Sequence, residues 1–221
     1  MLKLNENANV NRYDWTAARL PELVSKAPAK HVADIGAGDG RMKAAVEKAG
    51  GIWNGFDLFP QSSNILRWDL DEPCPGTERP GVAIMLDVVE HLNNPWNAIR
   101  NVSDYLLPGG YLIITTPNPL WSRSRLLAVL DGEPPCFTQS DLDLNHHVFV
   151  PWPHIVQQLL LDRNMVVEHY ATIDGKTQWP GAPYNLRYPV RILFSLLGQW
   201  IEGRDPRACG MSYAFIARKK S

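Results

Sequence analysis

The sequence predicts an α/β protein with a doubly wound, mostly parallel sheet. Short apolar segments alternate with segments of helical periodicity from about residue 30 to residue 172, as in repeated strand–helix units. The segment 81–87, GVAIMLD, is almost entirely apolar, as expected for a central parallel strand that is buried on both faces. Acidic and polar residues follow several apolar segments, and ligands bind at such strand ends in doubly wound sheets.

Seven strands are expected, and local signals set the helix boundaries between them. The strands cover residues 31–35, 52–58, 65–70, 81–87, 111–116, 165–170 and 212–217. The helices cover residues 16–25, 41–48, 94–107, 153–163 and 189–201. Gly50 and Gly51 end the second helix, and Pro95 suits the first turn of the third because proline lacks a backbone N–H.

The chain is expected to form a single domain, residues 1–221, with three additions around the sheet. Residues 117–152 and 174–211 are irregular in pattern, and we expect them to fold over the ligand-binding edge as lids for substrate. Residues 1–29 are expected to form an N-terminal cap, which either closes over the ligand or covers a face of the sheet.

Composition excludes several classes of function. The formal net charge of −1 over 221 residues gives no general attraction to nucleic acid or to a membrane. Cys74, Cys136 and Cys209 are widely spaced, which fits neither a zinc site nor a disulfide framework and is typical of a reducing compartment. The N-terminus lacks the apolar core of a signal peptide, and no apolar run has the length of a membrane span. We expect a cytoplasmic protein.

The segment 32–42, VADIGAGDGRM, predicts a ligand-binding turn after the first strand. Gly36, Gly38 and Gly40 at alternate positions allow a tight turn and a close approach of the backbone to a ligand. Asp34 and Asp39 place negative charge beside this turn, which disfavours a pyrophosphate. The spacing G-x-G-x-G also differs from the G-x-G-x-x-G of dinucleotide sites. A cationic ligand without phosphate, such as S-adenosylmethionine, therefore fits better than NAD.

Two further acids follow the next strands and suit a nucleoside. Asp57 lies about twenty residues beyond the turn, where a carboxylate can accept both hydroxyls of a ribose. Its alternative role is that of a solvated loop acid. Asp69 could bind an adenine amino group or cap the turn at residues 71–73, and the sequence favours neither.

At this point the chain resembles the class I S-adenosylmethionine-dependent methyltransferases. VADIGAGDGRM resembles the first motif of that family, and GFDLFP resembles its ribose-acid motif. Residues 82–118 resemble the central block, and HHVFVPWPHIVQQLL resembles the segment that follows it in the small-molecule branch. The resemblance covers roughly residues 30–172 and the last strand, and it implies a Rossmann-like sheet in which that last strand is antiparallel. The short connection between Asp57 and residue 65 departs from the family, which often has a full helix there.

The resemblance also implies a cofactor site for S-adenosylmethionine, with S-adenosylhomocysteine as the product. Asp34 and the backbone around Gly36 and Gly38 would hold the methionine end, and Asp57 would hold the ribose. Asp69 and Leu70 would flank the adenine, and Asp87 and Val88 would line the transfer site. The full set of implied cofactor residues is Asp34, Gly36, Ala37, Gly38, Gly40, Asp57, Leu58, Asp69, Leu70, Asp87 and Val88.

Four residues are candidates for the catalytic base: Glu90, His91, His146 and His147. Histidine is the usual base because its ordinary pKa lies near neutrality. Some relatives use E-x-x-E-H with a later histidine to bind a divalent metal, but the first acid here is Asp87, so the match is partial. The alternative is that Glu90 and His91 pin their loop by hydrogen bonds. We predict no metal, and we expect His146 or His147 either to act as the base or to order the lid.

The segment 189–201 has apolar residues at helical spacing. We expect this stripe to pack on the protein's own sheet or on a second subunit, with a homodimer as one option. The alternative is a surface that meets a lipid or an acyl chain, with Arg187 and Arg191 facing an anionic group.

The function that the sequence predicts is methyl transfer to a small-molecule acceptor, with oxygen as the expected acceptor atom. The alternatives are an RNA or protein methyltransferase and a cofactor-binding protein without catalysis. No clustered basic stripe supports RNA as a partner.

Overall fold

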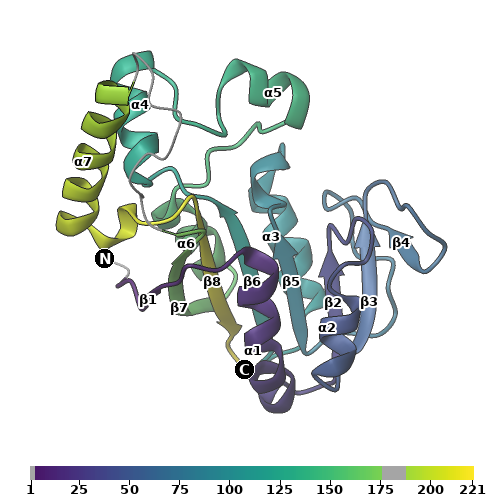
Figure 1. Ribbon diagram of the computed structural model, residues 1–221. Coiled ribbons are helices and arrows are strands. Elements are labelled where there is room, and N and C mark those ends of the chain that lie inside the picture. The colour runs from purple at the N-terminus through teal and green to yellow at the C-terminus, as the bar shows by residue number, and fades with distance from the viewer. Residues whose placement is uncertain (1–2, 176–187) are drawn as a thin grey trace.

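A computed structural model describes residues 3–175 and 188–221, and it forms one sheet with helices on both faces (Figure 1). The strands are β1 (Glu6–Asn7), β2 (His31–Ile35), β3 (Ile52–Asp57), β4 (Ile65–Arg67), β5 (Val82–Leu86), β6 (Tyr111–Pro117), β7 (Met165–Ile173) and β8 (Ser212–Lys219). The α-helices are α1 (Arg12–Lys26), α2 (Lys43–Lys48), α3 (Pro95–Tyr105), α4 (Ser122–Asp131), α5 (Gln139–Asn145), α6 (Pro153–Leu161) and α7 (Tyr188–Arg204). Two short 3-10 helices are η1 (Val89–His91) and η2 (Pro206–Ala208).

The sheet follows the order β1-β7-β8-β6-β5-β2-β3-β4 and confirms the predicted α/β architecture. Strand β8 runs antiparallel to both β6 and β7, and the other neighbouring strands are parallel. After β4 the chain returns to the other side of β2 and continues with β5. The direction of strand order therefore reverses between β2 and β5, and a ligand crevice is expected beyond the carboxyl ends of these two strands.

The sheet has eight strands, where the sequence predicts seven. The additional strand is β1, which pairs in parallel with the edge of β7. Backbone hydrogen bonds from Asn5 N to Tyr170 O (2.8 Å) and from Ala8 N to Thr172 O (2.9 Å) hold it there. A two-residue strand carries no periodic signal in its own sequence, because only the open edge of β7 gives it a partner.

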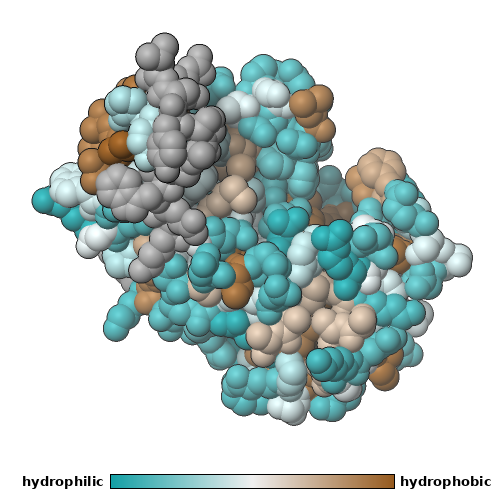
Figure 2. All heavy atoms as spheres, viewed as in Figure 1, coloured by the Kyte–Doolittle hydropathy of each residue, from teal (hydrophilic) through white to brown (hydrophobic). Residues whose placement is uncertain are grey.

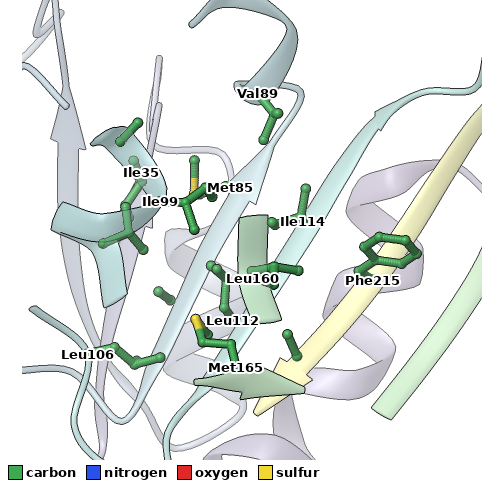
Figure 3. Close-up of a cluster of buried hydrophobic side chains, with 14 of the residues drawn as sticks. Ile35, Met85, Val89, Ile99, Leu106, Leu112, Ile114, Leu160, Met165 and Phe215 are labelled. Atoms are coloured by element: carbon green, nitrogen blue, oxygen red, sulfur yellow. The ribbon is translucent and has the colours of Figure 1, made fainter. Parts of the chain in front are cut away.

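Two apolar layers fix the sheet between its helices. On one face, Ile99 of α3 and Leu160 of α6 pack against strand residues such as Met85, Leu112 and Ile114 (Figure 3). On the other face, the helices contribute buried side chains that pack on β2, β5 and β6, and these are Trp15, Leu20, Val24 and Val46. Helix α1 therefore covers a face of the sheet, and its first residue reaches the ligand-binding edge.

Side-chain caps begin α1 and α3, and α1 starts at Arg12 rather than at residue 16 as expected. Asn11 accepts hydrogen bonds from the backbone of Tyr13 and Asp14 at the start of α1. Asn94 accepts from Asn97 N (3.1 Å), and Pro95 occupies the first turn of α3 as predicted.

The second helix begins at Lys43 rather than at residue 41, and further expected elements also differ from the structure. The third strand ends at residue 67, because Asp69 accepts from the backbone of Asp71 and Glu72 and so turns the chain. Residues 117–152, expected to be irregular, contain α4 and α5, and the latter begins with a reciprocal cap between Thr138 and Asp141. The expected helix at 189–201 is longer, from Tyr188 to Arg204. In the described part of the chain, none of the helices is both long and apolar enough to cross a bilayer.

Candidate active site

The glycine turn after β2 has the left-handed backbone that its alternating glycines allow. Gly36, Gly38 and Gly40 all have positive φ angles, of 73°, 54° and 78°. Only glycine adopts this conformation without a steric cost. A Cβ on Gly36 would lie 2.5 Å from Cγ2 of Val88, so the turn packs directly on the loop after β5. A Cβ on Gly38 would meet nothing within 4 Å, which leaves its backbone open to a ligand.

A pocket of about 430 Å³ lies beyond the carboxyl ends of β2, β3 and β5. Figure 2 shows the molecule hollowed at this place, between α5 and the loops after β3 and β4. Seven predicted cofactor residues line it: Gly36, Asp57, Leu58, Asp69, Leu70, Asp87 and Val88. Its volume falls in the range of about 300–1,000 Å³ that is typical of small-molecule sites. Asp34, Ala37, Gly38 and Gly40 are not among the residues that line this pocket.

Asp57 joins the glycine turn to the end of β3. Its Oδ2 accepts a hydrogen bond from Gly38 N at 2.9 Å, and its Oδ1 accepts from Phe59 N at the same distance. These bonds aim the carboxylate along the pocket wall. Each oxygen keeps a second lone pair, so Asp57 can still accept two hydroxyl groups.

Asp34 lies behind the turn, almost completely buried. Trp53 of β3 donates from Nε1 to Asp34 Oδ2 at 2.9 Å. Burial raises the pKa of Asp34 to about 6; the Trp53 hydrogen bond opposes this shift, and the charges of Asp57 and Asp39 add to it. The carboxylate is thus ionised above pH 6 and places negative charge behind the amides of the glycine turn.

Asp87 stands where the first pocket meets a second one, of about 350 Å³. Its backbone is left-handed, with a φ of 53°, which brings its side chain beside the ends of β5 and β6. Oδ1 accepts from the Thr115 hydroxyl at 2.8 Å, and Oδ2 forms an ion pair with Arg12 at 2.8 Å. Burial raises the pKa of Asp87, and the positive charge of Arg12 opposes that rise.

Three of the predicted catalytic residues line the second pocket: Glu90, His91 and His147. The rings of His91 and His147 meet edge to face, with centroids 4.8 Å apart. Glu90 is buried and accepts a hydrogen bond from the Thr116 hydroxyl at 2.8 Å. Burial, together with the charge of Asp87, raises the pKa of Glu90 to about 8, so this carboxyl is protonated at neutral pH. Burial and the neighbouring His147 lower the pKa of His91.

His147 has a defined tautomer. Its Nδ1 lies 2.5 Å from the carbonyl oxygen of Cys136. A carbonyl only accepts, so Nδ1 carries the proton and Nε2 of the neutral ring keeps its lone pair. His147 therefore offers a proton acceptor, or a metal ligand, at Nε2.

His146 is separated from His147 although the two are adjacent in sequence. His146 is exposed, ends α5 with a φ of 57° and lines the first pocket. His147 lines the second pocket, so the left-handed turn at His146 directs the two rings to different sites. The backbone N–H groups of Val148 and Phe149 bond to the carbonyl of Glu90, which fixes this segment over the crevice.

The cluster of Glu90, His91 and His147 also has the donor types of a divalent cation site. One ligand atom from each residue lies within 4.8 Å of the others. Opposite ligands around Mg²⁺ stand about 4.2 Å apart, since each bond is about 2.1 Å long. The cluster would have to contract to hold such an ion.

Several residues of the two pockets were not predicted from the sequence. Arg12 comes from the N-terminal helix, Cys136 and Met211 come from the irregular segments, and Ser212 begins β8. Phe56 and Trp68 form apolar walls of the first pocket. The aromatic residues beside the predicted acids were an available signal for the walls, whereas no local pattern marks Arg12.

With this geometry in place, comparison with known proteins assigns the family. Residues 10–169 match the methyltransferase domain family, which is more than half of the chain. The chain belongs to this family. The predicted class I S-adenosylmethionine-dependent methyltransferase fold is therefore confirmed, and membership implies S-adenosylmethionine as the cofactor.

Relatives of this methyltransferase domain include two ubiquinone biosynthesis O-methyltransferases. The protein from Bordetella avium is 26% identical over 140 residues, which cover 57% of this chain and 56% of the relative. The protein from Coxiella burnetii is 25% identical over 103 residues, which cover 40% and 44%. The chain spans about half the length of the curated relatives that it matches.

Solved methyltransferases share the fold over nearly the whole chain. A SAM-dependent methyltransferase from Archaeoglobus fulgidus has a TM-score of 0.62 at 17% identity and covers 95% of both chains. A putative sarcosine dimethylglycine methyltransferase from Galdieria sulphuraria has a TM-score of 0.59 at 14% identity, covering 94% of this chain and 85% of that one. At these identities the likeness concerns the fold alone.

Proposed function

We propose that this protein transfers a methyl group from S-adenosylmethionine to a hydroxyl oxygen of a small-molecule acceptor. The observation that carries the proposal is the pair of adjoining pockets that share Asp87 and His91. The first pocket has the acids and the glycine turn for a cationic nucleoside. The second has a histidine with a free lone pair. The names of the two curated relatives, both O-methyltransferases, support oxygen as the acceptor atom.

The residues of the first pocket fit the cofactor in shape and charge. Asp57 would accept the ribose hydroxyls, and the turn at Gly36 and Gly38 would lie against the methionine end. Asp34 would attract the α-ammonium group from behind the turn. Asp69 and Leu70 would flank the adenine, while Val88 would lie at the transfer site. When bound, S-adenosylmethionine supplies a methyl group on a positively charged sulfur.

In the proposed reaction, His147 acts as the general base. Its Nε2 accepts the proton of the acceptor hydroxyl while the new C–O bond forms and the methyl–sulfur bond breaks. The Cys136 carbonyl holds the ring in the required tautomer. Positioning the acceptor oxygen against the methyl group lowers the barrier by removing rotational and translational freedom, and proton removal adds to this effect.

His91 and Glu90 would position the acceptor and the base. His91 packs edge to face on His147, and Glu90 anchors the loop through its carbonyl and its bond to Thr116. A protonated Glu90 can also donate a hydrogen bond into the second pocket.

Two measurements test the proposal. Calorimetric titration should give tight binding of S-adenosylhomocysteine and none of NADH. Incubation with methyl-labelled S-adenosylmethionine and a panel of phenols and sugars should then transfer label to oxygen. Binding of NADH instead of S-adenosylhomocysteine would refute the cofactor assignment, and label found only in RNA or protein would refute the acceptor class.

A further inference from the structure

Helix α7 is built with its apolar side outward. The residues that it buries are Ser195, Gly198 and Glu202. They lie at helical spacing on the side that packs against α4, and Ser122 of α4 donates to Glu202 Oε1 at 2.8 Å. Small and polar residues thus form the buried centre of this contact, and Ile192, Phe194 and Ile201 are half-buried beside them.

The opposite side of α7 carries a row of large apolar residues. Their exposed fractions range from 39% to 57%, and they are Val190, Leu193, Leu196, Leu197 and Trp200. Figure 2 shows hydrophobic residues gathered at the upper left of the molecule, over α7. The expectation that this stripe packs on the protein's own sheet is therefore wrong. A contiguous exposed apolar row marks a surface that meets another molecule or a membrane.

The charges on α7 complement a negatively charged surface. The only acid of the helix is Glu202, which is buried on the side facing α4. Of its two cations, Arg191 lies four residues before Ser195 on the side that faces the protein, whereas Arg204 lies one turn after Trp200 on the outer side, with its guanidinium 4.1 Å from the ring centroid of Trp200. An apolar row with tryptophan and arginine at its end is typical of helices that lie in the interface of an anionic bilayer. Arg187, expected to face an anionic group, lies outside the described residues.

A second copy of the chain fits this face less well. A stable protein interface takes about 20–30 residues from each partner, whereas the apolar row of α7 has five.

We propose that the outer face of α7 docks the protein on the surface of an anionic lipid bilayer, as a peripheral contact. Leu193, Leu197 and Trp200 enter the boundary between headgroups and acyl chains, and Arg204 contacts lipid phosphate. The chain continues from α7 through η2 to Met211 and Ser212, which line the second pocket. The docked face is therefore joined by a short segment to the acceptor side of the site.

Co-flotation of the full chain with vesicles tests this inference. The protein should float with vesicles of phosphatidylcholine and phosphatidylglycerol, float far less with phosphatidylcholine alone, and dissociate as NaCl is raised. The double variant Leu193→Gln, Leu197→Gln should lower vesicle affinity about tenfold or more, because two apolar side chains are lost from the contact. Arg204→Glu should weaken binding to the anionic vesicles selectively.

Leu66→Gln is the matched control, because Leu66 is equally exposed but lies on β4 at the far edge of the sheet. It should leave flotation unchanged, and all variants should keep the thermal unfolding midpoint of the wild type. The inference is overturned if the wild type ignores anionic vesicles or if the double variant floats as well as the wild type. A double variant that only converts a dimer to a monomer in analytical ultracentrifugation would assign the face to a second copy instead.

Discussion

Trp53 donates from Nε1 to Asp34 Oδ2 at 2.9 Å and thereby supports the charge behind the glycine turn. The two residues come from the neighbouring parallel strands β3 and β2. The indole also fills the space beside Gly55 and Gly40. A Cβ on Gly55 would lie 2.4 Å from the ring, and a Cβ on Gly40 would lie 3.5 Å from it. Trp53 is therefore a positioning residue for the carboxylate that would attract the cofactor's ammonium group.

This relationship predicts a pH dependence of cofactor binding. Asp34 has a pKa raised to about 6, so its charge is present above pH 6 and is lost as the pH falls through that value. The affinity for S-adenosylhomocysteine should fall below pH 6. In Trp53→Phe the indole N–H that stabilises the carboxylate is absent, so the midpoint should move to higher pH. Calorimetry between pH 5 and about 7.5 measures both midpoints.

The control is Trp96→Phe, since Trp96 lies on α3 and does not line the first pocket. This variant should keep the midpoint of the wild type. If Trp53→Phe weakened binding equally at every pH, the indole would have only a packing role.

The buried charge of Asp34 should lower the stability of the fold while it raises the affinity for the cofactor. The folded state holds the Asp34 proton more tightly than the unfolded state, so unfolding free energy falls as the pH rises from 3.8 to about 6. About two pKa units correspond to roughly 3 kcal/mol. Asp34→Asn should therefore stabilise the protein at pH 8 by up to about 3 kcal/mol and by much less at pH 4. The same variant should lose cofactor affinity at pH 8.

Urea unfolding at the two pH values, with calorimetry at pH 8, checks this prediction. Equal stability of the variant and the wild type at pH 8 would show that Asp34 carries no buried charge.

Replacement of Gly36 should have a local packing effect, and replacement of Gly50 is the control. Both Gly36 and Gly50 have a positive φ, but only Gly36 lies against Val88. Gly50→Ala should destabilise the fold by about 1–2 kcal/mol through its backbone alone. Gly36→Ala should destabilise it further and weaken cofactor binding. The double variant Gly36→Ala, Val88→Ala should recover part of the loss, whereas no recovery would mean that the contact with Val88 is unimportant.

The sequence predicted the sheet and the glycine turn because both depend on local patterns. Apolar runs mark buried strands, and alternating glycines mark a turn with positive φ. The bond between Trp53 and Asp34 depends on the register of two strands, and the ion pair between Arg12 and Asp87 depends on how α1 packs. Neither is encoded by spacing along the chain.

Helix α7 illustrates the same limit. Its periodicity predicted an apolar stripe correctly, yet it could not tell which side faces the protein. The orientation depends on contacts with α4 such as the bond between Ser122 and Glu202, and these residues are 80 positions apart.

If His147 is the base, substitution of the two adjacent histidines should have different kinetic effects. His147→Ala should lower kcat by about a hundredfold or more, because general base catalysis contributes about 10²–10⁴-fold. His146→Ala should change the KM for S-adenosylmethionine more than kcat, since His146 lines the first pocket. Added imidazole should partly restore His147→Ala. Full turnover of His147→Ala with the acceptor would remove His147 as the base.

Chelation distinguishes His147 as a base from His147 as a metal ligand. We expect turnover to be unchanged by EDTA and by added Mg²⁺ or Mn²⁺, because the atoms of Glu90, His91 and His147 lie up to 4.8 Å apart and Glu90 is protonated at neutral pH. A metal would instead need the charged carboxylate, so it would lower the pKa of Glu90 and release a proton on binding. Activity that is lost with EDTA and restored by Mn²⁺, with proton release in calorimetry, would make the cluster a metal site.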